Sequence, residues 1–139
     1  MCLRIKNSVP KVAEEDIICY KMLEECQQDR WRGYTYHSPF QEIPIKDEII
    51  HGLCPYVGEG DRSIKHINGF PSISEGYIHT YKTLLNAEEM CNYYTKLFEN
   101  DVHVFECKIP AGTEYYDGLD SNLLPGYASE RIVFVKKLF

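Results

Sequence analysis

The stretch Val102-His-Val-Phe-Glu-Cys-Lys-Ile-Pro-Ala-Gly112 decides the fold class of this chain. Apolar side chains at positions 105, 107 and 109 lie on one face of an extended chain, and charged ones at 106 and 108 lie on the other. Proline and two small residues then turn the chain. The pattern predicts a half-buried β-strand over 102–109 that ends at this turn.

The segment just before this strand has the clearest helical pattern in the chain. Asn86 is the expected N-cap, with Glu89 three residues further on as in a capping box. The apolar positions that then recur at helical spacing are Met90, Tyr93 or Tyr94, and Leu97. We expect a helix that ends near residue 100.

Other segments have the composition or the alternation of strands. They are residues 17–23, 31–37, 76–81, 113–116 and 131–139. The last is apolar on both faces through Val135, as expected for a central strand. Glycine and proline punctuate 39–76 and 118–129, which we expect to be mostly loop, with 54–75 as a candidate cover over a site.

This order of elements predicts an α+β domain. A chain of 139 residues suffices for one compact domain and hardly for two, so we assign residues 1–139 to a single domain. We expect a bent mixed or antiparallel sheet with one main helix packed on it. Its core should unite Phe105, Cys107, Ile109, Ile132, Phe134, Met90 and Leu97.

Composition argues against several classes of partner. With 15 basic and 21 acidic residues the formal charge is −6, so we expect no nucleic-acid partner. The longest run without a charged side chain has ten residues, well below the roughly 18 that cross a bilayer, and we expect no membrane partner. The start of the chain lacks the apolar stretch of a secretory signal, which favours a cytoplasmic location.

Motifs for cofactors and metals are missing from the sequence. It contains no GxGxxG or GxxxxGK[ST] phosphate-binding motif and no GxSxG nucleophile motif. The six cysteines form no CxxC pair, and we expect reduced thiols that serve as small core residues. A zinc site of Cys54 with His51 or His66 is the alternative to loop residues. We therefore predict no metal and no cofactor.

Tyr77, His79 and Tyr81 share one face of the expected strand 76–81. We expect them to line a ligand-binding concavity that the neighbouring long loop covers and that Tyr115 and Tyr116 close. In the alternative interpretation the tyrosines are half-buried strand aromatics, and His79 is a hydrogen-bonded bridge to the helix.

Three motifs occur together in the chain: Gly76-Tyr-Ile-His-Thr-Tyr81, Cys107-Lys-Ile-Pro-Ala-Gly-Thr-Glu-Tyr-Tyr-Asp-Gly118 and Tyr127-Ala-Ser-Glu-Arg-Ile-Val-Phe134. They resemble small uncharacterised proteins of Bacteroides-type gut bacteria and their phages, in which an IPxGTxYYxG turn precedes a YASExI strand. The resemblance covers about the last two thirds of the chain. It implies a domain of that family without a known activity.

A more distant likeness is to the ADP-ribosyltransferases, which arrange a histidine or arginine, a tyrosine or serine, and a late glutamate around NAD. The matching positions are His37, Tyr77 or Tyr81, and Glu130. Under this likeness His37 and Glu130 are the candidate catalytic residues, NAD is the cofactor, and the glutamate stabilises an oxocarbenium-like sugar centre. The Ser-Thr-Ser strand and the Glu-x-Glu turn of that group are absent from this sequence.

Together these observations favour a binding or interaction module whose partner is a protein or a small nucleotide-like ligand. Its eleven tyrosines suit recognition, because tyrosine offers a large contact area at a low entropic cost. The resemblance adds a phage or mobile-element accessory role. An NAD-dependent ADP-ribosyltransferase-like enzyme and a structural subunit of a larger assembly are the alternatives that the sequence leaves open.

Overall fold

The computed structural model describes residues 3–5, 9–25, 36–37, 44–58, 64–67, 70–73, 76–97 and 101–138. The strands are β1 (Leu3–Ile5), β2 (Lys11–Val12), β3 (Ile17–Glu25), β4 (Tyr36–His37), β5 (Pro44–Ile45), β6 (Tyr56–Val57), β7 (Ile64–Ile67), β8 (Phe70–Ile73), β9 (Ile78–Tyr81), β10 (Val102–Ile109), β11 (Glu114–Leu119), β12 (Pro125–Ser129) and β13 (Arg131–Lys137). The helices are α1 (Asp47–Ile50) and α2 (Leu84–Leu97).

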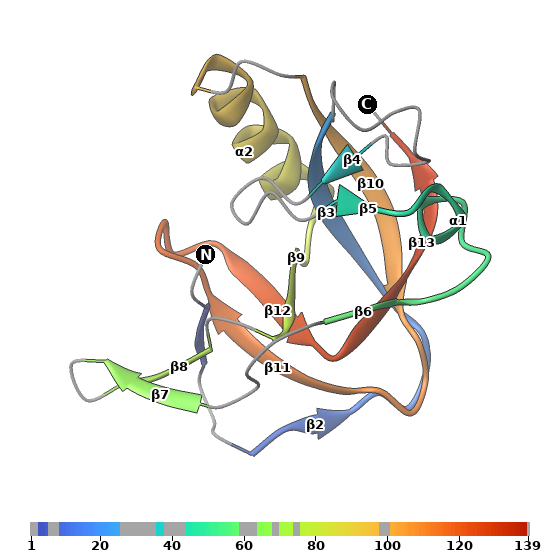
Figure 1. Ribbon diagram of the computed structural model, residues 1–139. Coiled ribbons are helices and arrows are strands. Elements are labelled where there is room, and N and C mark those ends of the chain that lie inside the picture. The colour runs from blue at the N-terminus through green and yellow to red at the C-terminus, as the bar shows by residue number, and fades with distance from the viewer. Residues whose placement is uncertain are drawn as a thin grey trace.

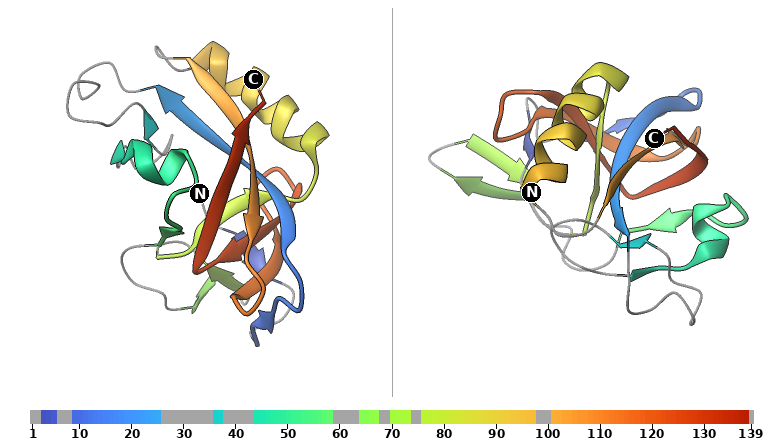
Figure 2. Two further views of the ribbon diagram at one scale, coloured as in Figure 1. Left: turned by 90° about the vertical axis from the view of Figure 1, so that its right-hand side faces the viewer. Right: turned by 90° about the horizontal axis from the view of Figure 1, so that it is seen from above.

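The strands form one antiparallel sheet in the order β6-β13-β10-β3-β9-β12-β11-β1-β8-β7. Three short strands lie outside this order: β2 pairs with β11, and β4 pairs with β3 and β5. Figures 1 and 2 show that the sheet is strongly bent, with α2 lying on one side of it. Within the described residues the end strands β6 and β7 do not pair, so the sheet stays open.

The fold is organised around the paired strands β3 and β10. Their ladder runs from Val102 opposite Glu24 to Ile109 opposite Ile17, and it confirms the strand predicted over 102–109. The strand predicted over 17–23 is also confirmed and continues to Glu25. On its other side β3 meets β9 at a single registered pair, Tyr20 opposite Tyr81.

Helix α2 begins earlier than predicted and buries a different stripe. The Thr83 hydroxyl accepts the backbone N–H of Asn86 at 3.2 Å, so Thr83 is the N-cap and Asn86 lies in the first turn. The buried helical residues are Ala87, Met90, Cys91 and Tyr94. Leu97 is 60% exposed, because the buried stripe passes through Tyr94 rather than toward Leu97. The predicted helix end near residue 100 lies outside the described residues.

The two faces of the sheet carry separate cores, so the prediction of one shared core was wrong for two residues. Five of the seven side chains do pack in one cluster, on the face away from α2: Phe105, Cys107, Ile109, Ile132 and Phe134. Met90 instead joins Met22 and Val104 in the cluster under α2. Because strand side chains alternate, neighbours such as Val104 and Phe105 contribute to opposite cores.

Two stretches that were expected to be loop contain strands. Strands β7 and β8 form a hairpin that extends the sheet beyond β1, and β12 lies in the stretch 118–129. Glycine misled the prediction there. A Cβ on Gly126 would lie 2.6 Å from the Thr80 carbonyl oxygen, and one on Gly118 would lie 2.4 Å from that of Arg4. These glycines allow close strand contact rather than a turn.

The expected fold class holds in outline. The described chain is a single bent antiparallel sheet with one main helix, and strands dominate it, so the α+β description applies only roughly. Of the strand predicted over 31–37, the described part is β4; residues 31–35 lie outside the described residues. No helix in the described ranges has both the length and the apolar character that crossing a membrane requires.

Candidate functional site

A group of charged and aromatic side chains gathers where β9, β11 and β12 lie side by side. We call it the Asp117 cluster, and its members are Lys11, Lys82, Tyr115, Asp117 and Tyr127. The β-strand alternation explains its assembly, because Tyr115 and Asp117 share one face of β11. Asp117 is registered opposite Tyr127, and Tyr115 opposite Lys11. Lys82 directly follows β9.

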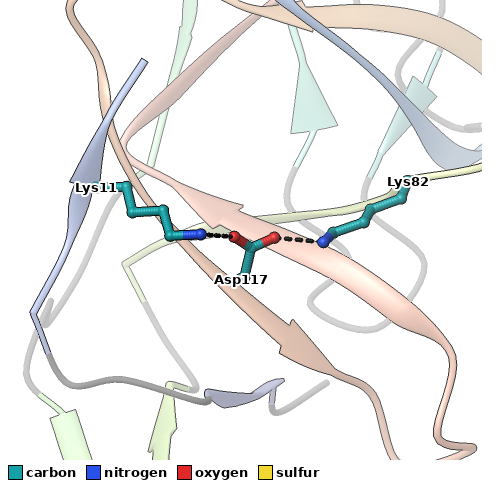
Figure 3. A network of polar contacts seen from close by, with 3 residues as sticks. All are labelled: Lys11, Lys82 and Asp117. Atoms are coloured by element: carbon teal, nitrogen blue, oxygen red, sulfur yellow. Dashed lines mark hydrogen bonds and ion pairs between the residues drawn. The ribbon is translucent and has the colours of Figure 1, made fainter. Parts of the chain in front are cut away.

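Asp117 holds two ammonium groups at once, as Figure 3 shows. Lys11 Nζ donates to Asp117 Oδ2 at 2.7 Å, and Lys82 forms an ion pair with Oδ1. The carboxylate is mostly buried, with 15% of its side chain exposed, whereas the Lys11 side chain is 61% exposed and that of Lys82 is 30% exposed. The carboxylate is thus the least exposed of the three groups, and the two ammonium groups approach it from opposite sides.

Two tyrosine rings adjoin these charges. Lys82 Nζ lies 5.0 Å from the centroid of the Tyr127 ring, within the range of a cation–π contact. The Tyr115 and Tyr127 rings meet edge to face, with centroids 5.7 Å apart. Both rings are partly buried. The cluster therefore combines a net positive charge with partly exposed aromatic surface.

The contacts within the cluster shift the pKa values of its members. Burial alone would raise the pKa of Asp117, but the hydrogen bonds from Lys11 and Lys82 outweigh it and lower that pKa. The hydrogen bond to Asp117 and its charge raise the pKa of Lys11. Burial, followed by the charge of Asp117, raises the pKa of Tyr127. All three groups therefore keep their ordinary charge states at neutral pH.

The neighbouring strands place one lysine and two thiols on the same face. Thr80 is registered opposite Tyr127, and Cys19 and Cys107 oppose each other across β3 and β10. Lys21 Nζ donates to the His79 carbonyl at 3.1 Å, and desolvation lowers the pKa of Lys21 to about 8. Burial raises the pKa of Cys19 to about 12. The thiols are therefore protonated and unsuited to nucleophilic catalysis.

The predicted ligand residues Tyr77, His79 and Tyr81 go to different surroundings. Tyr81 is buried against α2, and its hydroxyl donates to Asp120 Oδ2 at 3.3 Å. Tyr77 packs edge to face on Tyr116, with centroids 5.6 Å apart. His79 is half-buried, and its carbonyl accepts the bond from Lys21.

Tyr115 and Tyr116 lie on opposite faces of β11. Tyr115 therefore belongs to the Asp117 cluster, while Tyr116 is buried with Tyr77. Of the expected cover over 54–75, residues 54–58, 64–67 and 70–73 are described. Ile64 and Tyr77 both pack against the buried hydrophobic cluster that contains Tyr116. The rest of the cover lies outside the described residues.

The candidate catalytic residues His37 and Glu130 lie near opposite ends of β10. His37 is registered opposite Glu24, which in turn opposes Val102 at the start of β10. Glu130 precedes Arg131 and lies past the other end of that strand. Eight residues of β10 at about 3.3 Å each place the two at levels about 25 Å apart along the strand. Glu130 does lie beside Tyr77, since Ser129 is registered opposite Ile78.

Sequence reasoning missed Lys11, Lys82, Asp117 and Tyr127. The alternation in Thr113–Leu119 was the available signal, because it continues through Asp117 on the face of Tyr115. We expected this segment to end at Tyr116, since glycine at 118 suggested a turn. The lysines reach the cluster only through long-range strand pairing, which leaves no local pattern.

The zinc site considered for Cys54 with His51 or His66 does not appear among the described residues. Within the described residues, the one group of three or more ligating side chains at suitable separations contains neither Cys54 nor His51 or His66. The described cysteines, Cys19, Cys54, Cys91 and Cys107, are free.

Comparison with known proteins does not assign a function to these sites. No family model, no curated protein and no solved structure matches this chain. The assignment of a function therefore rests on the geometry of the described side chains.

Proposed function

We propose that this protein is a binding module for a small phosphorylated, nucleotide-like molecule, which it holds at the Asp117 cluster. The observation that carries the proposal is the pair of lysines on one mostly buried carboxylate. In a protein with a formal charge of −6, this cluster has two cations against one anion and so is locally positive.

The carboxylate fixes the spacing of the two cations. Each ammonium bonds to one oxygen of the same carboxylate, so the two nitrogens lie within about 8 Å of each other. An ammonium group has three N–H donors, and the bond to Asp117 uses one. The remaining donors of Lys11 and Lys82 suit the oxygens of a phosphate or a pyrophosphate.

The aromatic part of the cluster suits a base or another planar group. Tyr115 and Tyr127 are partly exposed beside the lysines and brace each other edge to face. Stacking of a base on an aromatic side chain contributes about 1–3 kcal/mol and tolerates any base. A nucleotide would thus satisfy both halves of the cluster, whereas free phosphate would use only the lysines.

Titration calorimetry and thermal shift with ADP, ADP-ribose, NAD, a cyclic dinucleotide, adenosine and inorganic phosphate test this proposal. A compound present at 100 times its dissociation constant should stabilise the fold by about 2.7 kcal/mol. We expect binding of the phosphorylated nucleosides, weaker binding of adenosine or phosphate alone, and a loss of affinity as salt is added.

Lys82→Gln is the test variant and Lys108→Gln is its matched control. Lys108 also pairs with an aspartate, Asp16, at 3.4 Å, and its exposure of 38% is close to that of Lys82. Lys82→Gln should weaken nucleotide binding and Lys108→Gln should leave it unchanged. Equal losses in both variants would refute the site. A screen in which no phosphorylated compound binds would refute the function and favour a protein partner.

A further inference from the structure

A second cluster of polar side chains lies at the far end of the β3–β10 ladder. Glu25 is the last residue of β3. Asp101 immediately precedes β10, and His103 is the second residue of that strand. The three project from the same face, because the register that pairs Glu24 with Val102 brings Glu25 opposite Asp101. We call them the Glu25 cluster.

The ligating atoms of the cluster converge. One imidazole nitrogen of His103 and one carboxylate oxygen each from Glu25 and Asp101 all lie within 4.8 Å of one another. His103 Nε2 and Glu25 Oε1 are 2.8 Å apart. Around a tetrahedral Zn²⁺ with bonds of about 2.0–2.2 Å, ligand atoms lie about 3.3–3.6 Å apart. A small movement would bring the three atoms to this spacing.

A backbone hydrogen bond places Glu25 and Asp101 side by side. The Glu25 N–H donates to the Asp101 carbonyl at 2.9 Å, which holds the ends of the two strands together. Like charges directly opposite each other on paired strands destabilise a sheet. A divalent cation between the two carboxylates reverses that effect, because each anion then faces the cation.

The imidazole is held by aromatic packing. The Tyr36 ring lies edge to face against His103, with centroids 5.8 Å apart, and also packs on Phe105 at 5.1 Å. The side chains of His103 and Glu25 are only 17% and 16% exposed. A ligand that is already oriented and partly desolvated loses little freedom when it binds a metal ion.

The nearby pair of His37 and Glu24 also joins a histidine to a carboxylate, and it differs from the Glu25 cluster in the number of ligands. His37 Nε2 lies 3.6 Å from Glu24 Oε2, and both side chains are more deeply buried than those of the Glu25 cluster. In the part of the chain that the structure describes, no third ligating side chain joins His37 and Glu24. That pair is a histidine–carboxylate contact, while the Glu25 cluster has the three protein ligands of an open metal site.

We propose that Glu25, Asp101 and His103 bind a divalent first-row transition metal of the Zn²⁺ type. The mixed nitrogen and oxygen ligands carry this choice, since an imidazole favours such ions and is a poor ligand for Mg²⁺ or Ca²⁺, which prefer oxygen alone. Three protein ligands leave a fourth position for water or for a donor atom of another molecule. The metal replaces the hydrogen between His103 Nε2 and Glu25 Oε1.

Titration of chelator-stripped protein with Zn²⁺ tests the proposal, with Co²⁺ absorption as the readout of tetrahedral coordination. We expect one ion per chain, and millimolar Mg²⁺ or Ca²⁺ should not displace it. Asp101→Asn and His103→Gln should each weaken Zn²⁺ binding more than about tenfold, since the loss of even an outer-shell partner costs about 10- to 100-fold.

The control is His51→Gln, which removes an exposed histidine outside the cluster. It should bind Zn²⁺ as the parent does. Asp101 is exposed, so its variant should fold even if His103→Gln does not. Equal Zn²⁺ affinity in Asp101→Asn and the parent, a tetrahedral Co²⁺ spectrum that persists in that variant, or an equal loss in His51→Gln would overturn the site.

Discussion

Cys107 on β10 lies directly opposite Cys19 on β3, and both side chains are fully buried. Burial raises the pKa of both thiols, that of Cys19 to about 12, so neither forms the reactive thiolate at pH 8. We expect iodoacetamide to label the partly exposed Cys54 in the native protein and to reach the opposed pair only in denaturant. Peptide mapping by mass spectrometry measures this, and native labelling of Cys19 would contradict the buried arrangement.

Asp117→Asn should make the protein less stable at pH 7, by about 1 to 2 kcal/mol, because it removes two charge-assisted contacts. The pKa of Asp117 is lowered in the folded state. Its contribution is therefore present above the unfolded pKa of about 3.9 and is lost as the pH falls through the lower folded value. Urea unfolding of parent and variant should give midpoints that differ at pH 7 and converge as the pH falls below the lowered folded pKa of Asp117. A difference that stayed constant down to pH 2 would show that packing, not charge, is responsible.

Phe134→Ala should cost about 3 to 5 kcal/mol, which is close to the whole stability of a small domain. Phe134 is 2% exposed and packs on both Phe105 and Tyr56. Leu97→Ala is the control, since Leu97 is exposed and its loss should change stability by less than about 0.5 kcal/mol. Thermal melts of the two variants check this contrast. Similar melting temperatures for Phe134→Ala and the parent would contradict the placement of β13 over the core.

Thr83→Ala should destabilise α2 by about 1 kcal/mol, because the Thr83 hydroxyl accepts the N–H of Asn86. Asn86→Ala should have a much smaller effect, as Asn86 is inside the helix, where alanine is the better helix former. Denaturant midpoints of both variants decide between the two positions. A larger loss for Asn86→Ala would restore Asn86 as the N-cap.

The sequence predicted those parts of the fold that local alternation determines. Strand 102–109 alternates apolar and charged side chains from Phe105 to Ile109, and the structure has the bounds that we predicted. The pattern was ambiguous at Tyr93 and Tyr94, because either residue could have been on the buried face of the helix. In the structure Tyr94 is the buried one, in the cluster that contains Met22 and Val104. Glycine was ambiguous in another way, since a residue without a side chain serves a turn and a close strand contact equally well.

The two proposed sites were beyond local patterns for a related reason. Lys11 and Asp117 are 106 residues apart in the chain, and Glu25 and His103 are 78 apart. Only the register of paired strands brings such residues together, and register follows from the whole sheet. Of the residues predicted for a ligand, Tyr115 alone belongs to the Asp117 cluster; that assignment as a ligand residue stays a prediction.

The single pair of Tyr20 with Tyr81 divides the sheet into two ladders joined at one rung. One ladder contains β3, β10, β13 and β6, and the other contains β9, β12, β11, β1, β8 and β7. The chain passes between them repeatedly, at β2 to β3, β6 to β7, α2 to β10, β10 to β11 and β12 to β13. Neither ladder is therefore a contiguous fragment, and no single cut at one of these connections divides the chain into one fragment for each ladder. Such interlacing ties the exchange of amide hydrogens in one ladder to the integrity of the other, even though they share so few backbone bonds.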